Sequence, residues 1–394
     1  MIFSGGAMHR HSRNPWLSHK QQARFLEMSR EAGFDLYGFT SANISEADRQ
    51  NLTEFAQKNQ SNDLHWFNRY LNLRTHPSDI LPGALSVLML GTIYRHPDMD
   101  AALENAKARI SRYAAGKDYH LVLRKKAAKL ADAFFLEHSS QLPDLKYRVT
   151  TDSAPVPEKI LARNAGLGWQ GKNTNLIHPE KGSYFFLTAV FFNADLEIPA
   201  LHEPVEEKQQ NEYGVHRTHR ANRAKGAHGP NKSYGEYRPS VEGSSDESNT
   251  GASETDSLFR PANVDRCGSC RQCLDACPTG ALEPYRIEAN RCLSYWTIEA
   301  REDMPPEIAQ NTKHWVFGCD ICQEVCPYNR GPKGRRQVTS EPDFFPRAAI
   351  KNWIQNPEDP AHSTVWEALS ISSAVKRPGQ ERFRRNWQSG SKPD

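Results

Sequence analysis

Cysteine is missing from most of this 394-residue sequence, because all eight cysteines lie between residues 267 and 326. A thiolate site or a disulfide is therefore excluded outside that segment. The sequence also lacks an apolar run of about 18 residues or more, the length that a membrane-spanning helix requires. Its first residues show neither an apolar secretory signal nor a twin-arginine signal. We therefore expect a cytoplasmic protein without membrane association, in a compartment that keeps thiols reduced.

A strong charge of one sign is also missing. Lys and Arg total 50 against 47 Asp and Glu, which leaves a formal net charge of +3. The whole chain is therefore no general polyanion binder, and a nucleic-acid surface has to be a local patch. Hydrophobic residues make up only 38% of the chain, which indicates that a polar segment adds length without adding core. The length predicts two or three domains.

The cysteines follow a spacing typical of iron–sulfur proteins. The first four read C-x2-C-x2-C-x3-C-P, and the last three read C-x2-C-x3-C-P after one isolated cysteine. In the bacterial form of this pattern, the fourth cysteine ligates the other cluster. The sequence therefore predicts two [4Fe–4S] clusters, one held by Cys267, Cys270, Cys273 and Cys326, and the other by Cys277, Cys292, Cys319 and Cys322.

Zinc binding and disulfide bonds account for the cysteines less well. C-x2-C pairs also bind zinc, but zinc motifs rarely carry three cysteines at this spacing followed by x3-C-P, an ending that occurs here twice. A disulfide scaffold is typical of small secreted domains, whereas this chain is long and has no cysteine outside one segment. Iron–sulfur clusters of the predicted kind move electrons one at a time.

The pattern along the chain predicts an α+β protein. Residues 201–260 are rich in Glu, Gly, Ser, Asn, Arg and His and cannot bury enough surface to offset their ordering entropy. Their basic stretch is either a solvated linker or a contact for RNA. We divide the chain into a disordered N-terminus (1–15), an α/β domain (16–200), a disordered insertion (201–260), a ferredoxin-type two-cluster domain (261–330) and a short helical, basic tail (331–394).

Apolar periodicity predicts the elements of the first domain. Ser18 is expected to cap a helix that Gly33 ends. Apolar residues recur at helical spacing between residues 120 and 138, which predicts a long helix with a charged outer face. Continuous apolar runs predict buried strands. We expect strands at 34–40, 87–94, 147–151 and 184–192.

Two segments N-terminal to the cysteines contain candidate functional residues. The first is TTDSAPVPEK, in which Asp152 follows a predicted strand. The alternative for Asp152 is an ordinary turn residue, since Asp and Pro both favour turns. A plain electron carrier needs only the cysteine segment, so the long patterned region before it favours a catalytic cofactor or a substrate site.

The second segment is AGLGWQGKNTNLI, residues 165–177. Its three glycines allow the backbone to approach a large ligand closely, and Lys172, Asn173 and Asn175 supply donors. It matches neither the Walker loop nor the dinucleotide fingerprint. A glycine-rich loop alone is weak support for a binding site.

Six strings occur in an order that resembles the epoxyqueuosine reductases. They are DSAP, AGLGWQGKNTNLI, GSYFF, CGSCRQCLDACPTGA, RCLSYWTIE and GCDICQEVCPYNR. The resemblance runs from about residue 18 to about residue 386, apart from the insertion. It implies an N-terminal domain with an open sheet flanked by helices, which binds cobalamin with its base off the cobalt. It also implies two [4Fe–4S] clusters that feed electrons to the cobalt.

The resemblance further implies a reaction and its partners. The family converts epoxyqueuosine to queuosine at the wobble position of the tRNA anticodon, and the epoxide oxygen leaves as water after two electrons and two protons are added. The implied partners are a tRNA anticodon loop that carries epoxyqueuosine and an external one-electron donor. A monomer is expected.

The resemblance also assigns residues. Asp152 falls on the proposed proton donor, and to donate near neutrality it needs a pKa raised by desolvation. Ser294 and Tyr295 fall between cobalamin and the nearer cluster. The residues expected to line the cofactor cavity are Arg74, Lys117, Asp152, Lys172, Asn173, Asn175, Ser183, Ser294 and Tyr295.

Two basic stretches could hold RNA phosphates, with salt-dependent binding. The alternative for each is an ordinary solvated surface. An unstacked wobble base is a reasonable target, because anticodon loops are single-stranded. The stretches comprise Arg330, Lys333, Arg335 and Arg336, and Lys376, Arg377, Arg382, Arg384 and Arg385.

Two rival functions use the same motifs. A cobalamin-dependent reductive dehalogenase would share both cofactors, but such enzymes are usually exported and commonly use a tyrosine as the acid. A non-catalytic electron carrier, or an RNA-binding protein with structural clusters, would contain iron and sulfide without a corrin. The cobalt content of the purified protein therefore separates the carrier from the enzymes.

Overall fold

The computed structural model describes residues 15–60, 62–152, 154–197, 264–332 and 337–390. All of these residues belong to one compact unit. The predictions made for the first 14 residues, for the insertion 201–260 and for Lys333, Arg335 and Arg336 lie outside the described residues.

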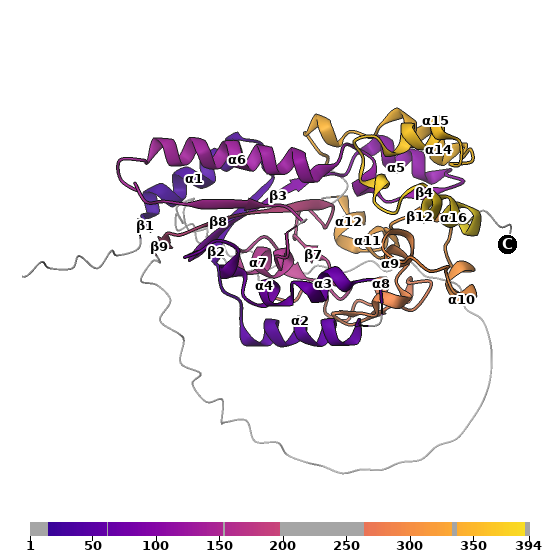
Figure 1. The fold of residues 1–394 in the computed structure, drawn as a ribbon, viewed down its shortest axis with the longest axis horizontal. Coiled ribbons are helices and arrows are strands. Elements are labelled where there is room, and N and C mark those ends of the chain that lie inside the picture. The colour runs from indigo at the N-terminus through magenta and orange to yellow at the C-terminus, as the bar shows by residue number, and fades with distance from the viewer. Residues whose placement is uncertain (1–14, 61, 153, 198–263, 333–336, 391–394) are drawn as a thin grey trace, which may run out of the picture. The chain divides into compact units, whose positions relative to one another are not determined.

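A four-stranded antiparallel sheet forms the centre of the N-terminal half (Figure 1). Its strand order is β2 (Leu36–Ser41), β3 (Ser86–Ile93), β8 (Phe185–Phe192) and β5 (Tyr147–Thr150). In the register of the central pair, Leu88 lies opposite Val190. All eight residues of β3 are buried, because both faces of the sheet are covered, and this explains the continuous apolar run in the sequence.

Alternate residues of the central strands face two different hydrophobic cores. Leu88, Leu90 and Phe192 pack against α1 (His19–Glu31) and α6 (Tyr119–Glu137), where the rings of Phe25 and Phe134 stack with centroids 3.9 Å apart. Val87, Met89 and Phe191 pack on the other face, against α7 (Glu158–Asn164). Figure 1 shows α1 and α6 on one side of the sheet and α7 on the other. Successive side chains of a strand point to opposite faces of the sheet, so a fully apolar strand contributes to both cores.

The predicted elements of this half are present with small shifts at their ends. Ser18 caps α1 through a capping box with Gln21, as expected from its position before an apolar helix. The long helix α6 begins after Asp118, whose side chain accepts from the backbone N–H of His120. The other helices of this half are α2 (Glu46–Lys58), α3 (His65–Arg69), α4 (Leu71–Thr75), η1 (Pro77–Ile80), α5 (Pro97–Glu104) and η2 (Arg112–Ala114).

Among the described residues, four short strand pairs lie outside the central sheet, and two of them connect distant parts of the chain. β1 (Trp16–Leu17) pairs with β9 (Asp195–Leu196), and β6 (Trp169–Gln170) pairs with β7 (Leu176–Ile177) inside the glycine-rich loop. β10 (Leu282–Glu283) pairs with β11 (Arg286–Ile287). β4 (Arg109–Ile110) runs parallel to β12 (Trp315–Phe317) and so joins the first half of the chain to the cysteine segment.

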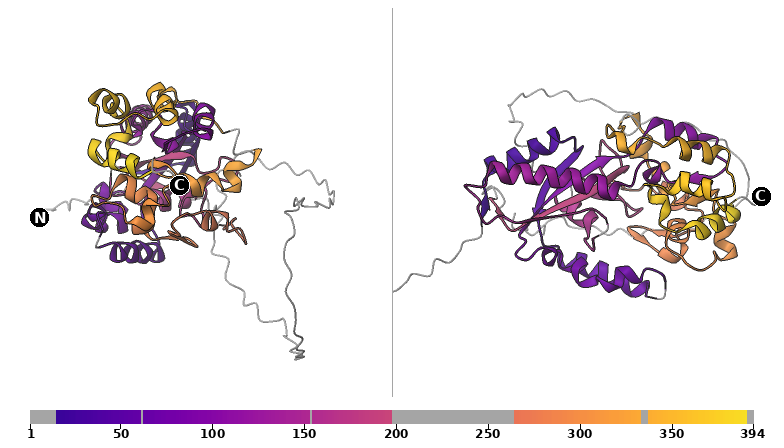
Figure 2. Two further views of the ribbon diagram at one scale, coloured as in Figure 1. Left: turned by 90° about the vertical axis from the view of Figure 1, so that its right-hand side faces the viewer. Right: turned by 45° about the horizontal axis from the view of Figure 1, so that its top comes forward.

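Short helices separate the cysteines, and longer helices follow them. The helices of the cysteine segment are α8 (Gln272–Asp275), η4 (Ala289–Arg291), α9 (Leu293–Ile298), α10 (Pro306–Ala309), α11 (Ile321–Glu324) and α12 (Pro327–Arg330). The C-terminal part contains η5 (Pro342–Phe344), α14 (Ala348–Gln355), α15 (Ser363–Ser370), η6 (Ala374–Lys376) and α16 (Gln380–Gly390). Both views of Figure 2 show these yellow helices beside the orange cysteine segment, and α16 packs on β12 and α9. The helical tail that the sequence predicts is therefore present.

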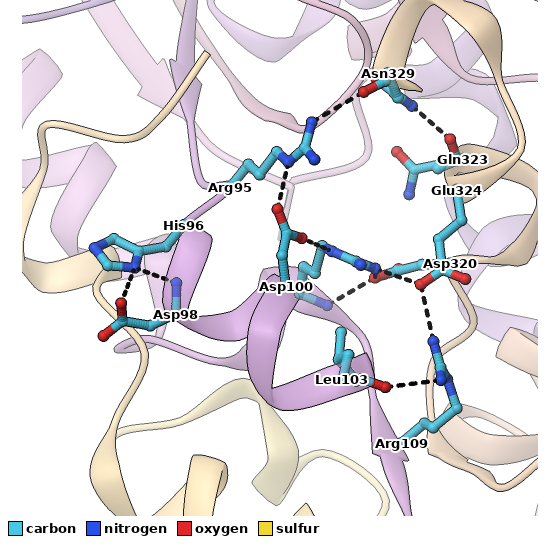
Figure 3. A network of polar contacts seen from close by, with 11 residues as sticks. Arg95, His96, Asp98, Asp100, Leu103, Arg109, Asp320, Gln323, Glu324 and Asn329 are labelled. Carbon is cyan, nitrogen blue, oxygen red and sulfur yellow. Dashed lines mark hydrogen bonds and ion pairs between the residues drawn. The ribbon is translucent and has the colours of Figure 1, made fainter. Parts of the chain in front are cut away.

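A buried network of ion pairs ties the cysteine segment to α5 and β4 (Figure 3). Arg112 contacts Asp100 at 2.7 Å, Asp320 at 3.0 Å and Glu324 at 2.6 Å. Arg109 also reaches Glu324, at 3.0 Å. The side chain of Asp320 is only 2% exposed, so its charge is compensated almost entirely by protein groups. Within the described ranges, none of the helices has the length and apolar character needed to cross a bilayer.

Candidate active site

Four thiols of the cysteine segment line one cavity of about 230 Å³. Asn173, Asn175 and Ser294 also line it. The four thiols belong to Cys277, Cys292, Cys319 and Cys322. They are the same four residues that the crossed cluster assignment places together.

The thiols also influence one another electrostatically in the predicted sets. Burial and then the charges of Cys267 and Cys273 raise the pKa of Cys326 to about 11. Burial and then the charges of Cys322 and Cys292 raise the pKa of Cys319 well above its usual value. The charge of Cys277, the fourth cysteine of the first run, contributes to the raised pKa of Cys292, and the charge of Cys273 also acts on Cys322 of the other set. The fold thus brings together cysteines that the sequence separates.

The donor chemistry fits two [4Fe–4S] clusters. No three His, Cys, Asp or Glu side chains of the described part of the chain converge on the position of a single metal ion. A cubane cluster does not require such convergence, because each of its four thiolates binds a different iron atom. Eight thiols in two sets, without additional ligands, match that requirement.

The glycine-rich loop holds the cysteine segment in place. Lys172 donates from Nζ to the backbone carbonyl of Cys270 at 3.0 Å. The side-chain amide of Asn173 donates to the carbonyl of Cys322 at 3.2 Å, and that of Asn175 lies 3.9 Å from the Cys322 sulfur. In this structure Lys172 therefore supports the loop of one predicted cluster, and Asn173 and Asn175 support that of the other. An N–H near a cluster sulfur is one of the factors that set the cluster's potential.

Asp152 stands just beyond the end of β5 with a left-handed backbone, φ +50°. Its Oδ2 accepts hydrogen bonds from the hydroxyl of Tyr119 and from Nε2 of His120, the latter at 3.1 Å. Its backbone N–H donates to the carboxylate of Glu158 at 2.7 Å. The side chain is still 57% exposed. Asp152 is therefore more than a turn residue, since three side chains hold it in a strained conformation.

Neighbouring groups set the proton affinities around Asp152. Burial acts to raise the pKa of Asp152, but hydrogen bonds from His120 and Tyr119 outweigh it and lower the pKa. The raised pKa expected once corrin and nucleobase desolvate the site stays a prediction, because in the protein alone two donors stabilise the carboxylate. Burial, followed by the charge of Asp152, instead raises the pKa of Glu158 to about 8.

Arg74 lies on the same side of the sheet as Asp152 and Glu158. It is buried, and its guanidinium lies 5.1 Å from the ring centre of Trp66 and 4.5 Å from that of Phe67. Its Nε has no hydrogen-bond partner among the described residues. A buried donor without a partner is costly, so this position fits a polar group of a bound ligand.

Several other predicted cofactor residues are engaged within the chain. Lys117 pairs with Asp343 at 2.6 Å and is exposed. Ser183 donates from Oγ to Gln323 at 2.9 Å. The hydroxyl of Tyr295 accepts from the backbone N–H of Asp63 at 3.1 Å, so this side chain is used at the α2–α3 connection. Their role toward a cofactor stays a prediction.

Two family models match this chain. The model described as epoxyqueuosine reductase QueG, DUF1730, matches residues 74–153, and that of the 4Fe-4S double cluster binding domain matches residues 266–329. The epoxyqueuosine reductase of Leadbetterella byssophila is 30% identical over 356 residues, covering 90% of this chain and 93% of that protein. The chain belongs to the epoxyqueuosine reductase family.

Other comparisons agree with this membership. The epoxyqueuosine reductase of Xanthomonas campestris pv. campestris is 31% identical over 381 residues, covering 93% of this chain and 85% of that protein. A crystal structure of epoxyqueuosine reductase with an epoxyqueuosine-modified tRNA-Tyr stem loop shares the fold, with a TM-score of 0.64 at 22% identity. That match covers 94% of this chain and 81% of the other.

The two family models cover part of the candidate site of this chain. The first model begins at Arg74 and ends just after Asp152, and the second encloses all eight cysteines. Sequence reasoning missed Tyr119, His120 and Glu158. The signals in the sequence were the position of Tyr119 and His120 shortly after Lys117, which the resemblance had placed at the cofactor cavity, and that of Glu158 in the TTDSAPVPEK segment.

Proposed function

We propose that this chain reduces epoxyqueuosine to queuosine at the wobble position of tRNA. The observation that supports it most is that one compact unit combines eight free thiols, four of which line one cavity, with Asp152 and its three partners. Relatives of 30% and 31% identity are named for this reaction. A solved structure of the same fold is described with an epoxyqueuosine-modified tRNA stem loop, which supports tRNA as the partner.

Two cofactors would complete the site. The cysteine sets would hold two [4Fe–4S] clusters, and the space near Arg74 and Asp152 would hold cobalamin, with its base off the cobalt as the resemblance implies. When bound, cobalamin supplies a nucleophilic metal centre and the clusters supply single electrons. The partnerless Nε of Arg74 is the feature of this chain that supports a polar ligand there.

The protein's own part in the reaction is proton delivery. Opening of the epoxide ring develops negative charge on oxygen, and a positioned acid lowers that barrier by about 10²–10⁴-fold in rate. Tyr119 and His120 both donate to Oδ2 of Asp152. No described residue donates to Oδ1 of Asp152, so that oxygen can face the substrate. Asp152 thus takes a proton on one oxygen while the other is held in place.

The arginines of the C-terminal basic stretch have partners within the chain. Arg377 pairs with Glu299 at 2.8 Å, and Arg384 pairs with Asp359 at 2.7 Å. Arg382 and Arg385 donate to backbone carbonyls of residues 296–302 and 378. These contacts engage the arginines within the chain, while the side chains of Arg377 and Arg384 stay 54% and 43% exposed.

We further infer that the enzyme works as a cytoplasmic monomer with an external one-electron donor. A tRNA substrate is found in the cytoplasm, and free thiols that load clusters need a reducing compartment. A non-catalytic carrier remains the alternative of another class. The corrin content of anaerobically purified protein tests it, because a carrier would contain iron and sulfide only.

The Asp152→Asn variant tests the proposed function. We expect it to bind tRNA and cofactors but to lose turnover, because the amide cannot donate the proton that the carboxyl group donates. Asp144→Asn is the matched control, since that carboxylate lies outside the site and only its backbone carbonyl has a described contact. Nucleoside mass spectrometry of the tRNA product measures conversion. Unchanged conversion by Asp152→Asn would remove this residue from the mechanism, and normal queuosine in cells lacking the protein would reject the function.

A further inference from the structure

The reduction needs two protons, and Asp152 can carry only one at a time. Conversion of the epoxide to the alkene takes two electrons and two protons, and the ring oxygen leaves as one molecule of water. Two C–O bonds break, one C=C bond forms, and both protons end on the oxygen. Under the proposed function, a second proton must therefore reach Asp152 or the substrate before water departs.

His120 is placed between two carboxylates. Its Nδ1 lies 2.6 Å from Oδ1 of Asp118, and its Nε2 lies 3.1 Å from Oδ2 of Asp152. An ionised carboxylate only accepts hydrogen bonds, so with both carboxylates ionised each ring nitrogen carries a proton. The imidazole ring also stacks on Tyr119, with centroids 4.1 Å apart. The geometry thus favours an imidazolium that points one N–H at the proposed acid.

We propose that His120 supplies the second proton of the reduction by passing it through Asp152. Asp152 is ionised at rest, so the first proton also leaves Nε2 of His120, passes through Asp152 to the ring oxygen and is replaced on His120 from solvent. The proton on Nε2 of His120 then moves to Oδ2 of Asp152. Asp152 delivers it to the substrate oxygen that received the first proton. His120 is left neutral, with its remaining proton on Nδ1 toward Asp118, and solvent returns the lost proton. His120 acts through Asp152 and is therefore a positioning and relay residue.

The charged groups around His120 support this assignment. Burial lowers the pKa of His120, but hydrogen bonds with Asp118 and Asp152 outweigh it and raise the pKa to about 9. Asp118 is in turn held by Lys376 from η6, at 3.2 Å. Tyr119 stays protonated, because burial and the charge of Asp152 raise its pKa well above the usual value.

Two further groups act on this site from other elements. Glu158 of α7 accepts from the backbone of Asp152, and burial and the charge of Asp152 raise the pKa of Glu158 to about 8. Arg377 acts on Asp152 from the C-terminal side and favours its ionised form. The His120 side chain is 25% exposed, so it can recover a proton from water. These groups together keep a proton on His120 at neutral pH without isolating it.

Single-turnover kinetics with pre-reduced, fully loaded enzyme and an epoxyqueuosine stem loop test the relay. We expect the wild-type rate to hold up to about pH 9 and to fall above it, following the pKa of His120. His120→Asn should be slower by about 10²-fold, at the low end of the range for proton transfer by a side chain, and should lose that decline. His19→Asn, an exposed change at the start of α1, is the control. A wild-type rate and pH profile in His120→Asn would overturn the proposal.

A second measurement needs no turnover and no variant that could fail to fold. Selective isotope labelling of histidine allows NMR titration of the His120 ring in the loaded wild-type protein. We expect a midpoint near 9, and a lower midpoint in Asp118→Asn, because that change removes a charge that favours the imidazolium. A midpoint at the ordinary value of about 6.5 would refute the relay. Failure of wild-type enzyme to form queuosine would instead refute the proposed function.

Discussion

Replacing Arg112 with Gln should destabilise the protein strongly. The Arg112 side chain is only 10% exposed and forms ion pairs with Asp100, Asp320 and Glu324. Asp320 is 2% exposed, so the variant leaves a buried carboxylate without its charged partner. Removing one partner of a buried ion pair costs about 3–5 kcal/mol. Gln keeps a polar amide but is shorter than Arg, so the change removes the charge together with the outer part of the side chain.

Urea unfolding under anaerobic conditions measures this cost as a change in the free energy of unfolding. Arg24→Gln is a matched control, because Arg24 also has three acidic neighbours but is 35% exposed. Exposed ion pairs are worth about 0–1 kcal/mol. The two variants should therefore differ by several-fold in their cost. A cost below about 1 kcal/mol for Arg112→Gln would show that water or a rearranged side chain satisfies Asp320, and would refute the argument.

The same variant should also lose iron. Asp320 follows Cys319 directly, and Glu324 lies between Cys322 and Cys326 in the chain. Arg112 therefore anchors the loop that supplies ligands to both predicted clusters. Iron analysis of the purified variant, compared with Arg24→Gln, checks this consequence. If the variant keeps its full iron content although it is fully destabilised, the ion-pair network is not required for cluster assembly.

Three further predictions concern the clusters, a close backbone contact and pH. Cys277→Ser should disturb the cluster of the second run while the other cluster keeps its paramagnetic resonance signal; loss of only the first-run cluster would contradict the crossed assignment. Gly38→Ala should lower the free energy of unfolding by at least about 1–3 kcal/mol, as overpacking does, since its Cβ would lie 2.2 Å from the carbonyl oxygen of Ala165. An unchanged melting temperature would contradict this. The raised pKa of His120 stabilises the fold fully below about pH 6.5, and this contribution is lost as pH rises to about 9. Glu158, with its pKa raised to about 8, adds a loss of the same sign; a melting temperature constant from pH 6.5 to 9 would exclude both.

The sequence predicted the elements that follow simple periodic rules. The strands near residues 87–94 and 184–192 and the helix near 120–138 are present as β3, β8 and α6. Their apolar patterns are long and uninterrupted, so local composition and tertiary burial favour the same structure. The short strands β4 and β12 were missed, because they form only where distant segments meet.

The candidate site was predicted unevenly for a similar reason. Asp152 stood out through the motif that carries the family resemblance, and the cysteines through their spacing. Tyr119 and His120 carry no motif of their own, and Glu158 lies in the TTDSAPVPEK segment without a predicted role. Their importance comes from the fold, which brings the end of β5 to the starts of α6 and α7. The lowered pKa of Asp152 is equally a product of those contacts.

The amino-acid sequence by itself determined the cluster chemistry, since cysteine spacing fixes which thiols a short loop can present to one inorganic core. It also determined the family, through ordered motifs that run through most of the chain. Only the tertiary structure decided where protons are held, because proton affinity depends on burial and on neighbours that lie far apart in sequence. It likewise decided that most of the C-terminal arginines have partners within the chain, since a cation's partners are set by the fold and not by its place in a basic stretch.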